Sequence, residues 1–163
     1  MKVRLLKSSV VALVIVSASL VSAAMHNEGE GRRGRPWEGW MGSGEWGMGS
    51  KYQRMYDPAH VETIHGTITA IERIVPMEGM SGGIHLLVKT DGETLPVHLG
   101  PIWYIERLDV KLAKGDKVEV RGSRVTMAGK PTIVASEVKR GDTVLMLRDE
   151  NGVPVWSGWR SSK

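Results

Sequence analysis

The sequence contains no cysteine. This absence excludes a cysteine-liganded zinc site, a covalently attached c-type haem and a thiol nucleophile. It also excludes disulfides, so an ordinary hydrophobic core must supply the stability of the fold. An H-E-x-x-H metalloprotease pattern is missing as well. The acidic residues are scattered among basic neighbours, and no nucleophile–base pair stands out. We therefore predict that the protein is not an enzyme.

No apolar run in the sequence has the length of a membrane span. The longest one covers residues 10–21 and follows three basic residues, Lys2, Arg4 and Lys7. Small residues at 22–24 then offer a cleavage site, which is the pattern of a secretory signal. We predict a signal peptide over residues 1–24, a periplasmic protein and no transmembrane span in the mature chain. The alternative is an uncleaved anchor helix.

The chain also lacks a large excess of charge. Its formal net charge is +4, and the signal supplies three basic and no acidic residues, which leaves +1 for the rest. A nearly neutral chain has no electrostatic footprint of the kind that nucleic-acid binding needs. We therefore expect no nucleic-acid partner.

β-Branched residues are absent from residues 25–57, which hold eight glycines between positions 29 and 49. Such a segment buries too little apolar surface to offset its chain entropy, so we predict a flexible tail. Its Trp37, Trp40 and Trp46 either lie loosely over the domain or form a docking motif for a partner or a membrane interface. The GSGEWG stretch at 42–47 has the letters of a dinucleotide fingerprint but not its strand–turn–helix context.

Residues 58–160 are predicted to form one all-β domain. Apolar and polar residues alternate in three consecutive segments, and Asp91-Gly92 is a hairpin signal between the second and the third. Gly66 within the first strand predicts a bend. Two more strands follow after residue 116, and a final hairpin is expected around Asn151-Gly152.

The third strand should end at Gly100-Pro101. Proline suits the first position of a helix, because its missing N–H is not needed there. The order is then three strands, a short helix, two strands and an extra hairpin. This order predicts an OB-fold-like five-stranded barrel with one helix after strand 3. Another small β-barrel or a β-sandwich is the alternative.

The stretches VHLGPIWYIE, LAKGDKVEVRGSRV, KPTIVASEVKRGD and LRDENGVPVW, taken together over residues 60–157, resemble small secreted bacterial OB-fold proteins. The pattern is similar to the C-terminal domain of the MamS/MamX magnetosome-associated proteins. More distantly, it resembles a periplasmic stress-tolerance OB-fold family. The resemblance implies a periplasmic β-barrel module. The haem role of MamX-type proteins does not carry over, because the C-x-x-C-H motif is absent, and no catalytic residue transfers.

Three histidines, His65, His85 and His98, lie on the outer faces of consecutive predicted strands. Three neutral imidazoles can hold copper or zinc. The alternative is that they are separate, solvated side chains. His26 is a further candidate metal ligand: cleavage after Ala23 would put it third in the mature chain, where it can bind Cu²⁺ or Ni²⁺ with the terminal amine and two backbone amides. Methionines in the tail and at 77 and 80 are a weaker candidate for Cu⁺ capture.

Together these patterns predict a non-enzymatic, exported binding or assembly module of the MamS/MamX type. Its partner would be a periplasmic protein or a small ligand, bound near Trp103 and Tyr104 in the short helix. A periplasmic copper-binding protein that uses the histidine face or the N-terminal tail is the alternative. No cofactor is expected otherwise.

Overall fold

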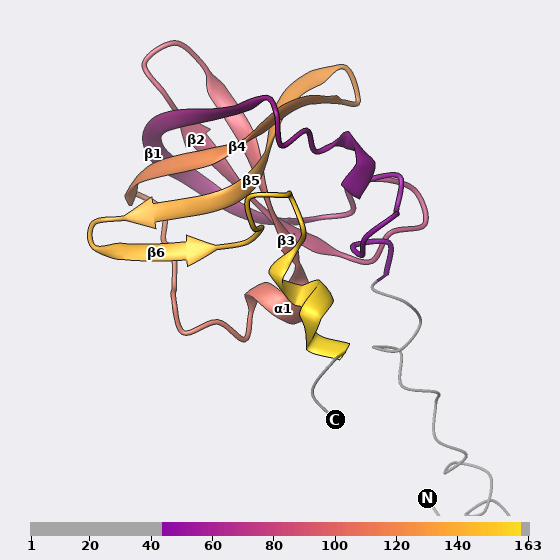
Figure 1. The fold of residues 1–163 in the computed structure, drawn as a ribbon. Coiled ribbons are helices and arrows are strands. Elements are labelled where there is room, and N and C mark those ends of the chain that lie inside the picture. The colour runs from indigo at the N-terminus through magenta and orange to yellow at the C-terminus, as the bar shows by residue number, and fades with distance from the viewer. Residues whose placement is uncertain (1–43, 161–163) are drawn as a thin grey trace, which may run out of the picture. The chain divides into compact units, whose positions relative to one another are not determined.

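The computed structural model describes residues 44–160, all within the second of the chain's two units, Glu38–Lys163 (Figure 1). The predicted signal peptide and residues 25–43 lie outside the described residues. The elements, in chain order, are the 3₁₀ helix η2 (Gln53–Met55), β1 (Val61–Ile74), β2 (Gly83–Lys89), β3 (Thr94–Pro101), α1 (Ile102–Ile105), β4 (Lys117–Met127), β5 (Lys130–Arg140), β6 (Thr143–Met146) and the 3₁₀ helix η3 (Val155–Arg160). None of the helices formed by these residues is long and apolar enough to cross a membrane.

The strands form one sheet that closes into a ring. Their order is β3-β2-β1-β4-β5-β6, and β3 also pairs with β5 in parallel at Val97–Ile133 and His98–Val134. The other neighbours are antiparallel. This barrel-like arrangement has the strand connectivity expected of an OB-fold, and α1, the α-helix of the described residues, lies between β3 and β4. The predicted fold class is therefore confirmed.

The curvature of the ring depends on β1, which pairs with β2 through its second half and with β4 through its first. The change of partner occurs at Gly66 and Thr67. A Cβ atom at Gly66 would lie 2.5 Å from the Lys89 carbonyl oxygen. Only glycine allows β2 to approach this closely where β1 bends.

The joint after β3 is tighter than the sequence predicted. Pro101 is the last residue of β3 and caps the helix from an extended conformation, with φ −68° and ψ 143°. The Ile102 amide, which has no partner within the helix, donates to the Gly82 carbonyl. The Glu106 amide still donates four residues back, to Ile102, but the amides of Arg107 and Leu108 donate only three residues back, and the chain then opens into the loop 106–116. The apolar residues between Ile105 and Leu112 therefore lie in a loop and not in the helix.

The core consists of the inward faces of the strands. The predicted stripes on the second, third and fourth strands are buried: Leu86 and Val88, Leu95, Val97 and Leu99, and Val118 and Val120. Ile133 and Val134 on β5 are also fully buried. The β5 segment 132–136 is buried on both faces, which shows that something also covers the outside of the ring there.

That cover consists of two flanking segments, residues 44–57 before β1 and residues 147–157 after β6. Trp46 is fully buried, and Tyr52 and Trp156 are at most 2% exposed. The segments are joined directly, since the Trp156 Nε1–H donates to the Trp46 carbonyl at 2.9 Å. Figure 1 shows the C-terminal segment in yellow, running from β6 past β3 to α1.

The prediction of a flexible tail up to Asp57 is therefore wrong for residues 44–57. The physical reason is that a few large side chains anchor this segment despite its glycines. The Trp46 Nε1–H donates to the Ser81 carbonyl at 3.0 Å, and the Trp46 ring meets Tyr52 edge-on at 4.8 Å. A buried aromatic residue with a satisfied N–H offsets much chain entropy. Trp46 is thus not loosely placed, whereas Trp37 and Trp40 lie outside the described residues.

The final hairpin also differs from the prediction. β6 pairs with the end of β5 across the turn at Gly141, with Arg140 opposite Thr143 and Glu137 opposite Met146. Around Asn151-Gly152 the chain makes a turn with a single bridge, between Arg148 and Pro154. Residues after 154 then form η3 instead of a second strand. The reason is that Leu147 and Arg148 bond back to Ser136 on β5.

Candidate functional site

The three predicted metal-ligating histidines do not come together. His85 and His98 are directly opposite each other on β2 and β3, with ring centroids 5.7 Å apart. His65 is on β1 opposite Glu119 of β4, and its side chain is 72% exposed. The cause is register, because residue 67 of β1 already faces Lys89, the last residue of β2. Alternation predicts the face of the sheet but not the position along it.

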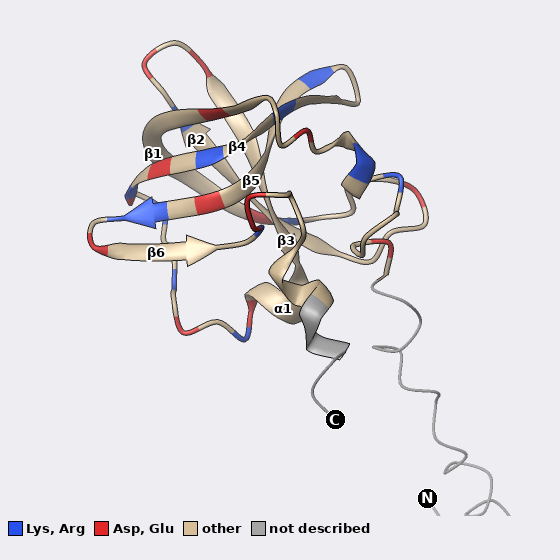
Figure 2. Cartoon of the chain, in the orientation of Figure 1, with Lys and Arg blue, Asp and Glu red and all other residues tan. Residues whose placement is uncertain are grey.

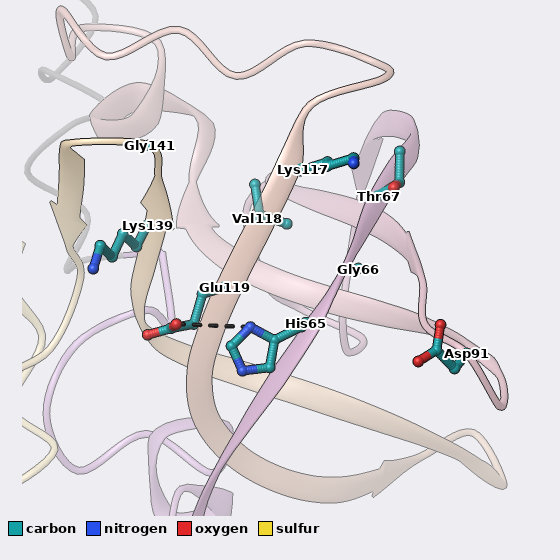
Figure 3. Close-up of a pocket in the computed structure, with 9 residues that line it drawn as sticks. All are labelled: His65, Gly66, Thr67, Asp91, Lys117, Val118, Glu119, Lys139 and Gly141. Atoms are coloured by element: carbon teal, nitrogen blue, oxygen red, sulfur yellow. Dashed lines mark ion pairs between the residues drawn. The ribbon is translucent and has the colours of Figure 1, made fainter.

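His65 lines a polar hollow of about 440 Å³ on the outside of β1, β4 and β5. Figure 3 shows the Glu119 carboxylate between the His65 ring and Lys139, while Asp91 stands apart. The His65 Nδ1 and a Glu119 oxygen are 3.6 Å apart. Two lysines and two carboxylates line this open hollow, so it offers no uniform charge for an ionic ligand. Exposed pairs of this kind contribute little binding energy.

His98 was predicted to lie on the outer face of its strand, and there its side chain is only 5% exposed. The N-terminal flanking segment covers it, with the Tyr52 ring stacked at 6.1 Å and the Tyr52 hydroxyl 3.3 Å from Nδ1. Desolvation lowers the pKa of His98 to about 4, and the nearby His85 and Arg148 act in the same direction. His98 is therefore a neutral imidazole at neutral pH.

Arg148 lies beside this pair and is the residue that sequence reasoning missed most clearly. Its side chain is 1% exposed, and its guanidinium stands 5.5 Å from the Tyr56 ring and 5.2 Å from the Trp156 ring. One nitrogen donates to the Ala135 carbonyl, while Nε and Nη2 find no partner among the described residues. Burial lowers the pKa of Arg148, and it raises the pKa of the neighbouring Tyr52 to about 12. Nothing in the sequence indicates that Arg148 is buried, because a basic residue next to a turn is usually exposed.

An apolar groove of about 310 Å³ opens at the helix end of the ring. Its floor comes from the strands and its wall from α1 and the loop 106–116. Its apolar lining residues are Ile71, Ile84, Leu86, Leu99, Ile105, Val110, Leu112 and Leu145. At the rim, an ion pair joins Arg73 to Glu106. The groove exists because α1 has a single turn and leaves this end of the ring partly open.

The two predicted ligand-binding residues, Trp103 and Tyr104, are both in α1. Trp103 is half-buried and packs against the core, and Tyr104 is 8% exposed with its ring 5.4 Å from Trp156. Neither lines the groove, but the next residue, Ile105, does. Their visible contacts hold α1 in place. Their predicted role in ligand binding stays a prediction.

Residues 79–83, GMSGG, have the letters of a G-x-S-x-G nucleophile elbow. That motif needs a strand-to-helix turn. Here the residues run from the β1–β2 loop into β2, and the Ser81 hydroxyl donates to the Gly44 carbonyl at 3.4 Å. The geometry of an elbow is not present.

Within residues 44–160, no group of three or more His, Asp or Glu side chains is arranged to hold a metal ion. Met77 and Met80 lie in the β1–β2 loop, and Met80 is buried in the core. His26 and the tail methionines lie outside the described residues. The metal predictions for these residues therefore stay predictions.

Comparison with known proteins connects this architecture to a family. A search of curated proteins finds no significant match. Residues 60–145, which are more than half of the chain and run from the start of β1 to β6, match the MamS/MamX magnetosome protein family. This range coincides with the ring of strands and includes the Gly100-Pro101 joint on which the sequence resemblance rested. The chain therefore belongs to the MamS/MamX magnetosome protein family.

Proposed function

We propose that this protein is an exported, non-enzymatic binding and assembly module of the MamS/MamX type, which works in the bacterial periplasm and binds a partner protein. The observation that carries the proposal is the apolar groove at the helix end of the ring. Its volume of about 310 Å³ is enough for a small number of apolar atoms. Ile71, at its edge, is 40% exposed although it is a large apolar residue.

The position of the groove matters because the usual ligand face of the fold is covered. OB-folds generally bind ligands across the outer face of strands 2 and 3. Here that face of β3 is packed against Tyr52 and Trp156 of the flanking segments. The groove is on a different part of the ring, between α1, β1 and β6. It is more apolar than the hollow beside His65, and a partner can reach it without displacing those segments.

The chemistry of the groove favours an apolar side chain of a partner flanked by charged residues. Its floor offers only aliphatic side chains, while Arg73, Glu106 and Lys111 stand at the rim. Charges of both signs at a rim give specificity and register more than affinity. Figure 2 shows acidic and basic residues interspersed over the strands rather than gathered into one basic patch, which supports a protein partner over a nucleic acid.

The predicted signal peptide supports export. It predicts that the purified periplasmic protein lacks residues 1–23 or 1–24. Because the sequence contains no cysteine, a single introduced cysteine gives a clean attachment point in that compartment.

Photo-crosslinking tests the function. We expect Ile71→Cys, labelled with a photoreactive maleimide, to give a discrete adduct with a periplasmic protein of the native host. Lys130→Cys, at the exposed start of β5, is the matched control and should give none. Adding Val110→Asp to the groove should abolish the adduct while the far-UV spectrum stays unchanged. Equal adducts from both positions, or an adduct that survives Val110→Asp, would show that the groove is not the binding site. Labelling by a small molecule instead of a protein would overturn the choice of partner.

Metal binding is the second candidate function, and one observation favours it. Two of the three predicted histidines, His85 and His98, face each other across adjacent strands. This arrangement makes the histidine face a better candidate for a metal than three scattered surface residues.

A further inference from the structure

His85 and His98 occupy directly opposite positions on two antiparallel strands. Opposite residues on one face of a sheet have their Cβ atoms about 5 Å apart, which is close enough for two imidazoles to reach one ion. The ring centroids are 5.7 Å apart and the rings are tilted by 42°. Two imidazoles bound to one metal at about 2.0–2.1 Å hold their centroids roughly 5–6.5 Å apart. The observed spacing falls within that range.

One nitrogen of His85 is already held in the way that metal-binding histidines are. Its Nε2 is 2.8 Å from a carboxylate oxygen of Glu72. Because a carboxylate only accepts, we assign the proton to Nε2, and this tautomer leaves the lone pair of Nδ1 free. This Nδ1 atom is buried and has no hydrogen-bond partner among the described residues. A histidine that donates one N–H to a carboxylate and keeps the other nitrogen bare is oriented and made more basic for a metal.

In His98, too, a neighbouring side chain engages one ring nitrogen. Its Nδ1 is 3.3 Å from the Tyr52 hydroxyl, so Nε2 is the nitrogen that this contact does not use. The His98 side chain is 5% exposed, so packing fixes its ring beside His85.

We propose that His85 and His98 form a two-histidine site for a divalent late transition-metal ion, Cu²⁺ or Zn²⁺. Water completes the coordination, and Glu72 and Tyr52 hold the two rings. Imidazole nitrogen suits both ions. The site rests on the second candidate function, metal binding; its two ligands lie outside the groove, although Glu72 also lines the groove. His65 is not part of it, because its ring belongs to the separate pair with Glu119.

The site can be tested in the full mature chain, in a His26→Ala background that removes the candidate site at the N-terminus. CuCl₂ and ZnCl₂ are titrated by calorimetry at neutral pH. Quenching of Trp fluorescence by Cu²⁺ gives a second readout, because Trp46 contacts Tyr52, which stacks on His98. We expect one ion per chain and an affinity at least tenfold weaker in His85→Ala. The matched control, His65→Ala, should bind as tightly as the parent.

Two further measurements keep the test independent of folding. Glu72→Gln, at an exposed residue, should weaken binding while the thermal unfolding curve stays unchanged, since it removes only the support of the His85 ring. The electron paramagnetic resonance spectrum of the Cu²⁺ complex should show coupling to two imidazole nitrogens. Unchanged affinity in a folded His85→Ala variant would overturn the site, and the function of metal binding would then move to His65 or the tail. Absence of any binding would overturn both.

Discussion

Replacing Trp46 tests whether the flanking segments belong to the fold. Its side chain is fully buried, its ring is 4.8 Å from Tyr52 and 6.4 Å from Trp156, and its Nε1–H donates to the Ser81 carbonyl. Trp-to-Ala changes at buried sites cost about 3–5 kcal/mol of unfolding free energy. We expect Trp46→Ala to lie near the middle of that range, about 4 kcal/mol. Trp46→Phe keeps part of the ring contacts and loses the hydrogen bond, so about 1–2 kcal/mol is expected.

Urea unfolding followed by circular dichroism measures both values, with the midpoint as the primary quantity. Met48→Ala is the control on the same segment, because Met48 is 57% exposed and should change the unfolding free energy by less than about 0.5 kcal/mol. A fragment of residues 44–163 should unfold cooperatively, whereas residues 58–163 should not. If Trp46→Ala lowers the unfolding free energy by less than about 1 kcal/mol, it behaves like an ordinary surface substitution. That result would refute the burial of this segment. The domain boundary would then return to residue 58.

Three further outcomes follow from the described contacts. Burial lowers the pKa of His98 from 6.5 to about 4, so the unfolding free energy should be full above pH 6.5 and fall by about 3 kcal/mol towards pH 4. The unfolding free energy of His98→Gln should not fall in this way between pH 6.5 and pH 4. An equal fall in both proteins would contradict the prediction. Arg148→Met should lower the unfolding free energy by less than about 1 kcal/mol, because the buried guanidinium has no carboxylate partner among the described residues. Arg148→Ala also leaves a cavity and should lower it by about 3 kcal/mol. Equal losses in urea unfolding would show that the hydrogen bonds of Arg148, and not its volume, stabilise the fold. Intact-mass measurement of the exported protein should show a chain that begins at Ala24 or Met25, and a mass that retains residues 1–23 would rule out the signal peptide.

The strand order was predictable because its signals are local. Alternation along Ile84, Leu86 and Val88 predicts one buried face for a short strand without any knowledge of its neighbours. Gly100-Pro101 likewise predicts where the third strand must end. The position of a helix after three strands then selects one topology among the small β-barrels. Each of these inferences depends on fewer than about ten consecutive residues.

The parts that could not be predicted depend on contacts between distant residues. His98 alternates with Val97 and Leu99, which predicts an outward side chain, but only the structure shows that Tyr52 covers it. The overall composition of residues 25–57 is rich in glycine and hides the single anchoring residue, Trp46. The whole segment was therefore predicted to be flexible. Arg148 is buried because two aromatic rings from separate segments enclose it. Side-chain parity specifies a face and cannot specify what packs on it.

The glycines on the covered face show that the cover is built into the strands. A Cβ atom at Gly83 on β2 would lie 2.3 Å from the Trp46 ring, and one at Gly100 on β3 would lie 2.8 Å from the Trp156 ring. Any other residue at either position would push an indole ring away, so the two strands accept the flanking segments only as glycine. A ligand bound to this face would have to displace two buried indoles, each of which contributes a large part of the marginal stability of a domain. The chain has therefore closed the face that other OB-folds use, and a partner protein must contact another part of its surface. The apolar groove beside Ile105 lies outside the covered face, whereas the histidine pair lies on that face, with Tyr52 stacked on His98.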